Sequence, residues 1–278
     1  MMDDDPGGLE AALSALEAEL ALPVTVIDNA FFLNRRNIFE YDRRSHRKNP
    51  VCEAGFCERC VRHCRYAMNS RCARERRPFL AVCWKGIAQI VAPLRHGNIH
   101  YGMLYLGLWK GAGPEPGTEA ELPPEFFRLR DTLSAPPEEL GGMLALAQLC
   151  ADGIVMKLLK ARLLDTVPDE RGARIAAFLR EHCSEPIGLG DLADELGLSR
   201  SRTSLVVREL FGESFSRRLQ AERVERARHF LAGSTATLRR IAAECGFSDE
   251  FHLSRVFKQH TGETPSEFRK RHLDPPKS

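Results

Sequence analysis

An eight-residue pattern that occurs twice constrains the fold of this chain more than any other feature. Residues 192–199 read LADELGLS, and residues 241–248 read IAAECGFS. Both copies begin with an apolar residue and Ala, carry Glu fourth and Gly sixth, and end in Ser. The first residues predict the inner face of a short helix, and Gly favours the left-handed backbone at a helix end. Because Ser199 and Ser248 can each cap a following helix, each copy predicts a helix-turn-helix.

The likeness between the two copies extends beyond these eight residues. GESFS at 212–216 is answered by GETPS at 262–266, fifty positions later, whereas the first pair lies forty-nine positions apart. The difference implies one extra residue in the recognition segment of the second copy. Residues 215–231 contain no Gly or Pro and predict a helix that joins the two units, and TPSE at 264–267 predicts another helix start. A single match would fit a plain helical hairpin, but two matches with the same flanks favour a tandem repeat.

On these residues, the region 171–271 resembles the DNA-binding domain of AraC/XylS-type transcription regulators. The second unit, IAAECGFSDEFHLSRVFKQHTGETPSEFRK, is very close to that family's motif, and the first unit matches it more loosely. The chain departs from the family at Val207, where an aromatic residue is usual near the end of the first recognition helix. The resemblance implies an all-α domain with two helix-turn-helix units held by a linker helix. Each unit would place a recognition helix in the major groove of DNA.

The resemblance places the recognition helices at about residues 200–210 and 249–260. Recognition helices present residues near their N-terminal ends to base edges. Arg202 and Arg255 are the candidates for direct readout, because a guanidinium pairs bidentately with guanine, although Arg255 could equally contact a phosphate. The predicted DNA-binding residues are Ser201, Arg202, Ser204, Leu205, Arg208, Glu250, Phe251, Ser254, Arg255 and Lys258.

The first 170 residues have a different pattern. Leucines at positions 9, 13, 16 and 20 predict an amphipathic helix, PVTVID at 23–28 predicts a strand, and residues 78–109 predict three strands with an RHGN turn. Residues 137–167 predict a long helix. Its heptad-like seam could pair with a second copy in a dimer or pack on the chain's own sheet. The seam consists of Leu140, Leu144, Ala147, Ala151, Ile154, Leu158 and Ala161.

Residues 9–110 resemble the PocR-type sensory domain, a PAS-like ligand-binding module. The resemblance implies an α+β sensor domain with a small-molecule effector. The chain departs from it in a shortened segment between Cys52 and Cys60 and in its additional cysteines. The residues that carry it are NPVC at 49–52, ERC at 58–60, CWKG at 83–86, APL at 92–94 and YGMLYLG at 101–107. We therefore expect a PocR-like sensory domain at 1–110, a loop and connecting helix at 111–170, and an AraC-type DNA-binding domain at 171–271.

Six of the nine cysteines fall within residues 52–83. Their spacings include C-x-x-C and C-x-x-x-C, at which thiolates can converge on one ion, and four cysteines form a tetrahedral site for zinc or an iron-sulfur cluster. Two alternatives stay open. The thiols could switch between redox states without metal, since basic neighbours lower thiol pKa values, or they could be small buried side chains. The candidate metal ligands are Cys52, Cys57, Cys60, Cys64 and Cys83.

Composition sets the broad class of protein. The 278-residue chain has 43% apolar and 28% charged residues, which is typical of a globular protein with a buried core. The acidic start and the lack of an apolar run near about 18 residues predict a cytoplasmic protein without a membrane partner. Residues 171–278 carry 19 Lys and Arg against 15 Asp and Glu, which is compatible with a polyanionic partner.

These patterns favour a sequence-specific DNA-binding transcription regulator, controlled by a ligand, metal or redox signal sensed in its N-terminal domain. The expected partners are double-stranded DNA, a small-molecule effector or metal, RNA polymerase, and a second copy in a homodimer. The alternative is an enzyme that uses a reactive cysteine for alkyl transfer, fused to a DNA-binding domain. It requires a base near the nucleophile, for which His46 and His63 are the nearby histidines. Because no nucleophile elbow, phosphate loop or paired carboxylates are visible, we expect no enzyme.

Overall fold

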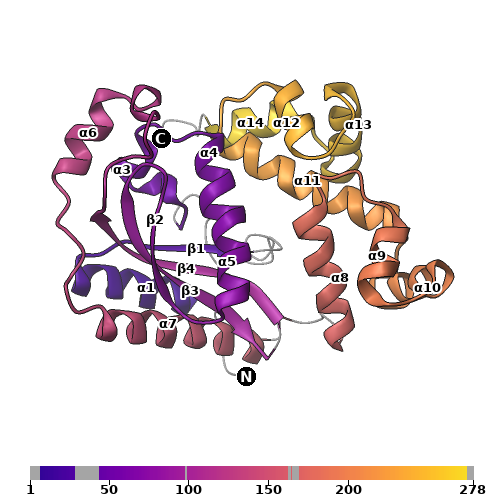
Figure 1. The fold of residues 1–278 in the computed structure, drawn as a ribbon, viewed down its shortest axis with the longest axis horizontal. Coiled ribbons are helices and arrows are strands. Elements are labelled where there is room, and N and C mark those ends of the chain that lie inside the picture. The colour runs from indigo at the N-terminus through magenta and orange to yellow at the C-terminus, as the bar shows by residue number, and fades with distance from the viewer. Residues whose placement is uncertain (1–6, 29–43, 98, 162–163, 165–168, 274–278) are drawn as a thin grey trace. The chain divides into compact units, whose positions relative to one another are not determined.

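The chain divides into two compact units. The computed structural model describes residues 7–28, 44–97, 99–161, 164 and 169–273. The first unit spans residues 1–166 and the second spans 167–278 (Figure 1). Residues 111–161, predicted as a loop and connecting helix, contribute helices that pack within the first unit. This division does not test the predicted domain boundaries at residues 110 and 170, which stay predictions.

A four-stranded antiparallel sheet forms the centre of the first unit. Its order is β1-β4-β3-β2, and its strands are β1 (Val24–Asp28), β2 (Phe79–Val82), β3 (Ile87–His96) and β4 (Ile99–Lys110). His96 pairs with Ile99, so the predicted RHGN turn connects β3 and β4. Gly97 has a φ of 56°, a left-handed conformation that two-residue hairpin turns use. The four predicted strands are therefore confirmed.

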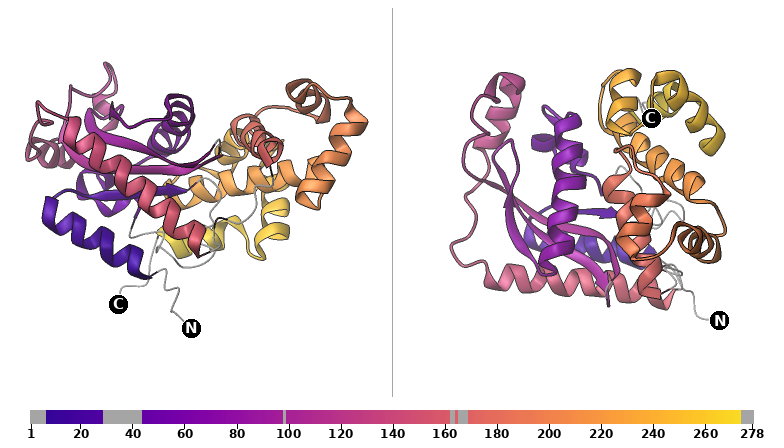
Figure 2. Two further views of the ribbon diagram at one scale, coloured as in Figure 1. Left: turned by 90° about the horizontal axis from the view of Figure 1, so that it is seen from below. Right: turned by 45° about the vertical axis from the view of Figure 1, so that its right-hand side comes forward.

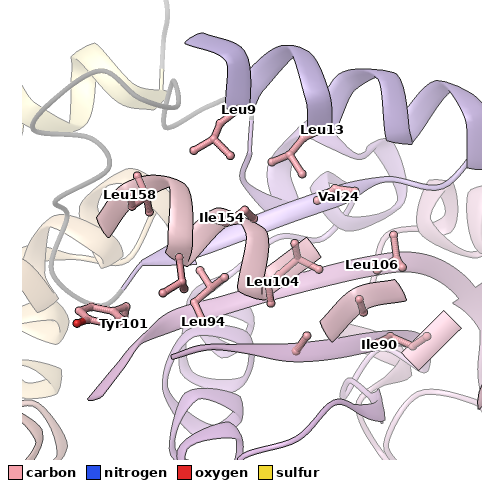
Figure 3. Packing of buried hydrophobic residues seen from close by; sticks show 14 of the residues in the cluster. Leu9, Leu13, Val24, Ile90, Leu94, Tyr101, Leu104, Leu106, Ile154 and Leu158 are labelled. Atoms are coloured by element: carbon pink, nitrogen blue, oxygen red, sulfur yellow. The ribbon is translucent and has the colours of Figure 1, made fainter. Parts of the chain in front are cut away.

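Helices α1 (Gly7–Leu20) and α7 (Gly141–Lys160) cover one face of this sheet (Figure 2). Figure 3 shows Leu9 and Leu13 of α1 and Ile154 and Leu158 of α7 against the apolar side chains of the strands. The seam predicted on α7 is therefore used within the unit, because the sheet offers it a continuous apolar surface. The strand residues in this cluster include Val24, Ile90, Leu94, Leu104 and Leu106.

The bounds of α7 differ from the prediction of a helix over 137–167. The helix begins at Gly141, after a stretch that contains Pro136 and Pro137, and it ends at Lys160. Residues 162–163 and 165–167 of the prediction lie outside the described residues. Among the described residues, α7 is the one helix whose length and composition would allow it to cross a membrane, with a mean hydropathy of 1.5. Its buried positions Ala147, Ala151, Ile154 and Leu158 face the sheet.

Further helices cover the other face of the sheet. Three consecutive elements form one continuous helical run over residues 58–75, with a π-helical middle part (Figures 1 and 2). Two apolar clusters lie beneath these helices, one around Trp84 and Phe126 and one around Tyr105. The elements are η1 (His46–Lys48), α3 (Pro50–Glu53), α4 (Glu58–Cys60), η2 (Val61–Ala67), α5 (Met68–Glu75), η3 (Glu119–Glu121) and α6 (Pro124–Asp131). The first unit is a small antiparallel sheet between helices, and its PAS-like identity stays a prediction.

In the second unit, the described residues form helices, as predicted. One cluster joins the first four helices, and the longest helix, α11, also packs against the last three. α11 therefore belongs to both halves of the unit, as the predicted linker helix should. The helices are α8 (Asp169–His182), α9 (Leu189–Leu196), α10 (Arg200–Phe211), α11 (Phe215–Gly233), α12 (Leu238–Glu244), α13 (Glu250–Thr261) and α14 (Pro265–Leu273).

Candidate nucleic-acid interface

The first helix-turn-helix is built as the sequence predicted. α9 is followed by Gly197, whose φ of 65° turns the chain. The amide of Leu198 donates to the carbonyl of Ala193 at 2.9 Å and closes the turn. Ser199 is the N-cap of α10, and its Oγ accepts from the amide of Arg202 at 3.3 Å. These contacts fix the direction in which α10 leaves the turn.

The second helix-turn-helix repeats this turn with one difference. Gly246 has a φ of 77°, and the amide of Phe247 donates to the carbonyl of Ala242 at 2.9 Å, which matches the bond from Leu198 to Ala193 in the first helix-turn-helix. The predicted cap Ser248 is wrong, because Asp249 is the N-cap of α13 and its Oδ1 accepts from the amide of His252 at 2.7 Å. The extra residue of the second copy therefore lies in the turn.

Asp249 is well suited to this position. Its carboxylate lies at the positive end of the α13 dipole, and a hydrogen bond from the His252 amide holds the pKa of Asp249 below its usual value. The Ser248 hydroxyl donates to Asp249 Oδ2 at 3.1 Å and also lies 3.1 Å from Nδ1 of His252. Ser248 thus supports the cap from outside the helix. The eight-residue match does not predict this arrangement, because it aligns the two copies on Gly and not on the cap.

The two recognition helices have the same length and the same register. Both contain 12 residues, and each ends at a left-handed glycine, Gly212 or Gly262. Counted from the caps, residue n of α10 corresponds to residue n plus 50 of α13. Val207 therefore corresponds to Phe257, an aromatic core residue that packs edge-on against Phe268 at 5.5 Å. The smaller Val207 is fully buried in the first helix-turn-helix, so the departure from the family pattern is a change of core side chain.

Each recognition helix has a buried inner face and a more exposed outer face. Thr203, Val206 and Val207 of α10 are buried, as are Leu253, Val256 and Phe257 of α13. Of the ten predicted DNA-binding residues, Ser204, Glu250 and Ser254 are half-buried. The other seven are exposed, namely Ser201, Arg202, Leu205, Arg208, Phe251, Arg255 and Lys258. Their contacts with DNA stay a prediction.

Two of these exposed side chains are large and apolar. Phe251 is 79% exposed and Leu205 is 52% exposed. Single exposed apolar side chains are common on protein surfaces, so a role of Phe251 and Leu205 in DNA contact stays a prediction. Near the C-terminal ends of α10 and α13, Arg208 and Lys258 occupy equivalent positions. Each helix-turn-helix therefore has a cation at the same point.

Arginines of α11 hold the two halves of the domain together. Arg223 Nε donates to the carbonyl of Cys183 at 2.7 Å, and its Nη2 donates to the carbonyl of Glu185 at 2.9 Å. Arg226 Nε donates to the carbonyl of Glu244 at the end of α12 at 2.8 Å. These arginines have no local sequence signal, because each bond joins segments that are distant in sequence. The bonds satisfy backbone carbonyls just after α8 and at the end of α12, and they tie both segments to α11.

The cysteine-rich part of the first unit was the second candidate site. Cys52 lies on α3, Cys57 precedes α4, Cys60 is on α4, Cys64 is in η2 and Cys83 follows β2, and none forms a disulfide. In the described part of the chain, no group of three or more His, Cys, Asp or Glu side chains is placed to hold a metal ion. The zinc or iron-sulfur interpretation therefore stays a prediction that the arrangement of these side chains does not support.

The thiols of this group differ in their electrostatics. Burial raises the pKa of Cys52 to about 12 and also raises the pKa values of Cys64 and Cys83. A hydrogen bond between the side chains of Cys57 and Cys60 lowers the pKa of Cys57 and raises that of Cys60. Of these five thiols, Cys57 therefore has a lowered pKa, whereas the other four have raised pKa values.

Two helix-turn-helix units with exposed recognition helices define the class of the second unit, and comparison with known proteins agrees. Residues 192–271 match a family described as a helix-turn-helix domain. The xylose operon regulatory protein of Escherichia coli strain K12 is 30% identical over 92 residues, which are 33% of this chain and 24% of that protein. The transcriptional activator RhaS of Escherichia fergusonii is 31% identical over 105 residues, 38% of each chain.

Similar solved structures include DNA-binding domains. A regulator with an AraC-type DNA-binding domain from Chromobacterium violaceum is 26% identical with a TM-score of 0.35, covering 37% of this chain and 91% of that one. The DNA-binding domain of AdpA in complex with a target DNA is 27% identical with a TM-score of 0.35, covering 37% of this chain and 96% of that one.

The second unit contains a helix-turn-helix domain over residues 192–271, and the relatives that it resembles are transcription regulators. The chain spans about a quarter of the length of the xylose regulator and 38% of RhaS, so these matches concern that domain. The resemblance of the first unit to PocR-type sensory domains stays a prediction.

Proposed function

We propose that this protein is a sequence-specific DNA-binding transcription regulator whose first unit receives the signal. The observation that carries the proposal is the shared register of α10 and α13. Both helices have 12 residues, a capped start and an outer face with cationic side chains. Two recognition helices on one domain can enter successive major grooves when they are spaced by about 34 Å along one face of DNA.

The two helices would read different sequences. Position by position, Ser201 corresponds to Phe251 and Leu205 corresponds to Arg255. Phe251 can contact a thymine methyl group, and Arg255 can pair with guanine or contact a phosphate. In α10, Arg202, Ser201 and Ser204 would contact the base edges. The proposed site is therefore asymmetric, with unlike half-sites about 10 base pairs apart.

Contacts with the DNA backbone would be alike in the two helix-turn-helix motifs. Arg208 and Lys258 are exposed cations at equivalent positions near the ends of α10 and α13. Each phosphate neutralised releases counterions, which makes affinity fall steeply with salt. These residues would position the domain, whereas the residues near the helix starts would select the sequence.

The first unit is proposed as the sensory part. Its resemblance to PocR-type domains supports a small-molecule effector, and its thiols make a metal or redox signal the alternatives. The names of the relatives, a xylose operon regulatory protein and a transcriptional activator, support a role in transcription through RNA polymerase. We further propose a cytoplasmic homodimer. Because the α7 seam is buried against the sheet, a dimer would use other residues.

No observation favours the alkyl-transfer alternative. His46 is buried with its Nε2 3.1 Å from Gln89 Oε1, and burial lowers the pKa of His46 to about 4. Burial also lowers the pKa of His63. Among the described residues, no hydrogen bond joins His46 or His63 to Cys57, so nothing there favours the base that nucleophilic transfer uses.

Selection from a random library of double-stranded DNA tests the proposal. The full chain should enrich a site with two unlike conserved blocks about one helical turn apart. Replacing Arg202 should erase preferences in one block, and replacing Arg255 should act on the other. Binding that enriches no sequence, with the protein folded by circular dichroism, would contradict the proposal.

A further inference from the structure

The side of α7 that faces away from the sheet is apolar. Leu149 is 69% exposed and Met156 is 47% exposed, although both are large apolar side chains. They lie seven residues, or about two helical turns, apart and therefore project from the same face of the helix. The most apolar 18-residue window of α7 has a mean hydropathy of 1.5, yet only 28% of that window is buried. The contact with the sheet therefore does not account for the apolar character of the whole helix.

Gly153 lies between these two side chains on the same face, and the three residues together form the outer stripe of α7. Gly153 is exposed, four residues after Leu149 and three before Met156. A Cβ placed on Gly153 would meet no atom within 4 Å, and its backbone is not left-handed. Glycine destabilises the middle of a helix relative to alanine. No contact within the described part of the chain requires this glycine, whereas the close approach of a second helix would.

Opposite charges flank the outer stripe. Asp152 and Lys157 are both exposed, and neither forms an ion pair with another described residue. The contact of the Asp152 carboxylate is a hydrogen bond from the Gln148 side chain, 2.8 Å long, within the same helix. At about 100° per residue, Asp152 and Lys157 lie on opposite sides of the outer stripe. The helix therefore presents an acidic edge and a basic edge beside one apolar stripe.

We propose that the outer stripe of α7 binds the same stripe of a second copy of this chain, with the two helices parallel. A parallel pair related by a twofold axis places the acidic edge of each helix against the basic edge of the other. Asp152 of each copy then lies beside the partner's Lys157, so both charges gain a partner. An antiparallel pair would place the two acidic edges together and the two basic edges together. Charge therefore selects the parallel orientation.

A second copy fits this face better than a lipid surface does. Asp152 lies midway along the apolar stretch, and a carboxylate is costly to place among lipid chains, whereas it gains a cation in the parallel pair. The second unit follows α7 in the sequence, so a parallel pair directs both DNA-binding units from the same end. This inference rests on the homodimer of the proposed function and names the surface that forms it. Its test measures association alone, without DNA.

Sedimentation equilibrium of the full chain over a range of concentrations tests the proposal. Leu149→Glu places two carboxylates at the twofold axis and should raise the dissociation constant of the dimer about 100-fold. Because Leu149 is exposed in the single chain, circular dichroism should be unchanged. Val82→Glu, at an exposed apolar position on β2, is the matched control and should associate as the unchanged chain does. A Leu149→Glu protein that still dimerises normally, or a Val82→Glu protein that dissociates, would overturn the proposal.

An exchange of charges tests the orientation of the pair. Asp152→Lys and Lys157→Asp should each weaken the dimer about tenfold, because each turns two attractive pairs into repulsive ones. The double variant, with both changes in every chain, restores opposite charges across the interface and should associate nearly as well as the unchanged chain. Single changes without effect, or a double variant in which the two losses add, would overturn the parallel arrangement.

The unchanged chain decides the matter even if a variant does not fold. It should sediment as a dimer without DNA, and a monomer at every concentration would overturn the proposal. If that monomer also pelleted with phosphatidylcholine vesicles, the outer stripe would be a lipid-binding face instead. Selection of a DNA sequence is measured separately, so a chain that stays monomeric but still enriches one site would contradict the α7 interface and leave recognition by α10 and α13 intact.

Discussion

A Cβ atom on Gly246 would lie 2.7 Å from the carbonyl oxygen of Cys183, so the second turn packs directly on the residue that follows α8. The same carbonyl accepts a hydrogen bond from Arg223 Nε. Gly246 also has a φ of 77°, which disfavours any side chain. One position thus combines a backbone requirement and a steric one, and it joins the second helix-turn-helix to the first half of the domain.

Gly246→Ala should therefore destabilise the protein more than Gly197→Ala. Gly197 has a φ of 65° but no atom within 4 Å of a Cβ placed there, so only the left-handed conformation is penalised, by about 1 kcal/mol. At Gly246 the carbonyl of Cys183 must also move, and we expect a loss of about 3 kcal/mol. Unfolding in urea, followed by circular dichroism, measures both. Equal losses would show that the contact with Cys183 does not constrain the turn.

The tandem helix-turn-helix could be predicted because its signals are local. Glycine at the helix end, an apolar residue after it and a polar cap all lie within a few residues, and the repeat presents them twice. The position of the extra residue could not be read from the eight-letter match. The offset of fifty residues between GESFS and GETPS is the one that applies to the recognition helices. It makes Asp249 the counterpart of Ser199.

Long-range arrangements were not predictable in the same way. Periodicity showed that α7 has an apolar seam but not whether that seam meets a sheet or a second chain. The spacing of the cysteines showed that they could converge, yet α3, α4, η2 and the end of β2 place them without a metal-binding set among the described residues. The burial of Lys85 was not predictable from the sequence, since a lysine in a turn is ordinarily exposed.

The cap of α13 gives a second prediction. Asp249→Ala should lower the melting temperature, because the amide of His252 loses its acceptor at the helix start. Ser248→Ala should change it little, since Ser248 contacts the cap but does not bond an amide of α13. A thermal scan of both variants measures this. If Ser248→Ala is the more damaging change, the cap has been assigned to the wrong residue.

The ion pairs of the buried Arg44 side chain in the first unit give a third prediction. Arg44 is 2% exposed and lies 2.7 Å from Glu10 and 2.8 Å from Glu17. Arg44→Ala removes the buried partner of two partly exposed carboxylates and should cost about 2 kcal/mol of unfolding free energy. Arg47, which pairs with Glu53 at a more exposed site, is the control, and Arg47→Ala should cost less than about 1 kcal/mol. Similar costs in urea unfolding would contradict the buried role of Arg44.

The same pair predicts a pH dependence. Burial alone would raise the pKa of Glu10, but the hydrogen bonds and charge of Arg44 lower the pKa below the usual value. A carboxyl with a lowered pKa in the folded state stabilises it above the unfolded pKa, and this contribution is lost as the pH falls through the folded pKa. The stability difference between the unchanged chain and Arg44→Ala should thus be full at pH 7 and shrink below about pH 4. A difference that grows on acidification would contradict the ion pair.

The measurement that tests the central claim most directly is the base preference of Arg255→Ala at the selected DNA site. Affinity should be measured for that site and for every single base-pair change, at one salt concentration, with Gln259→Ala on the same helix as the control. We predict a loss of about 1–3 kcal/mol and a relaxed preference at one base pair, with the other preferences unchanged. An equal loss on all sequences would make Arg255 a phosphate contact. An unchanged affinity and an unchanged base profile for Arg255→Ala and Arg202→Ala alike would contradict recognition of DNA through α10 and α13.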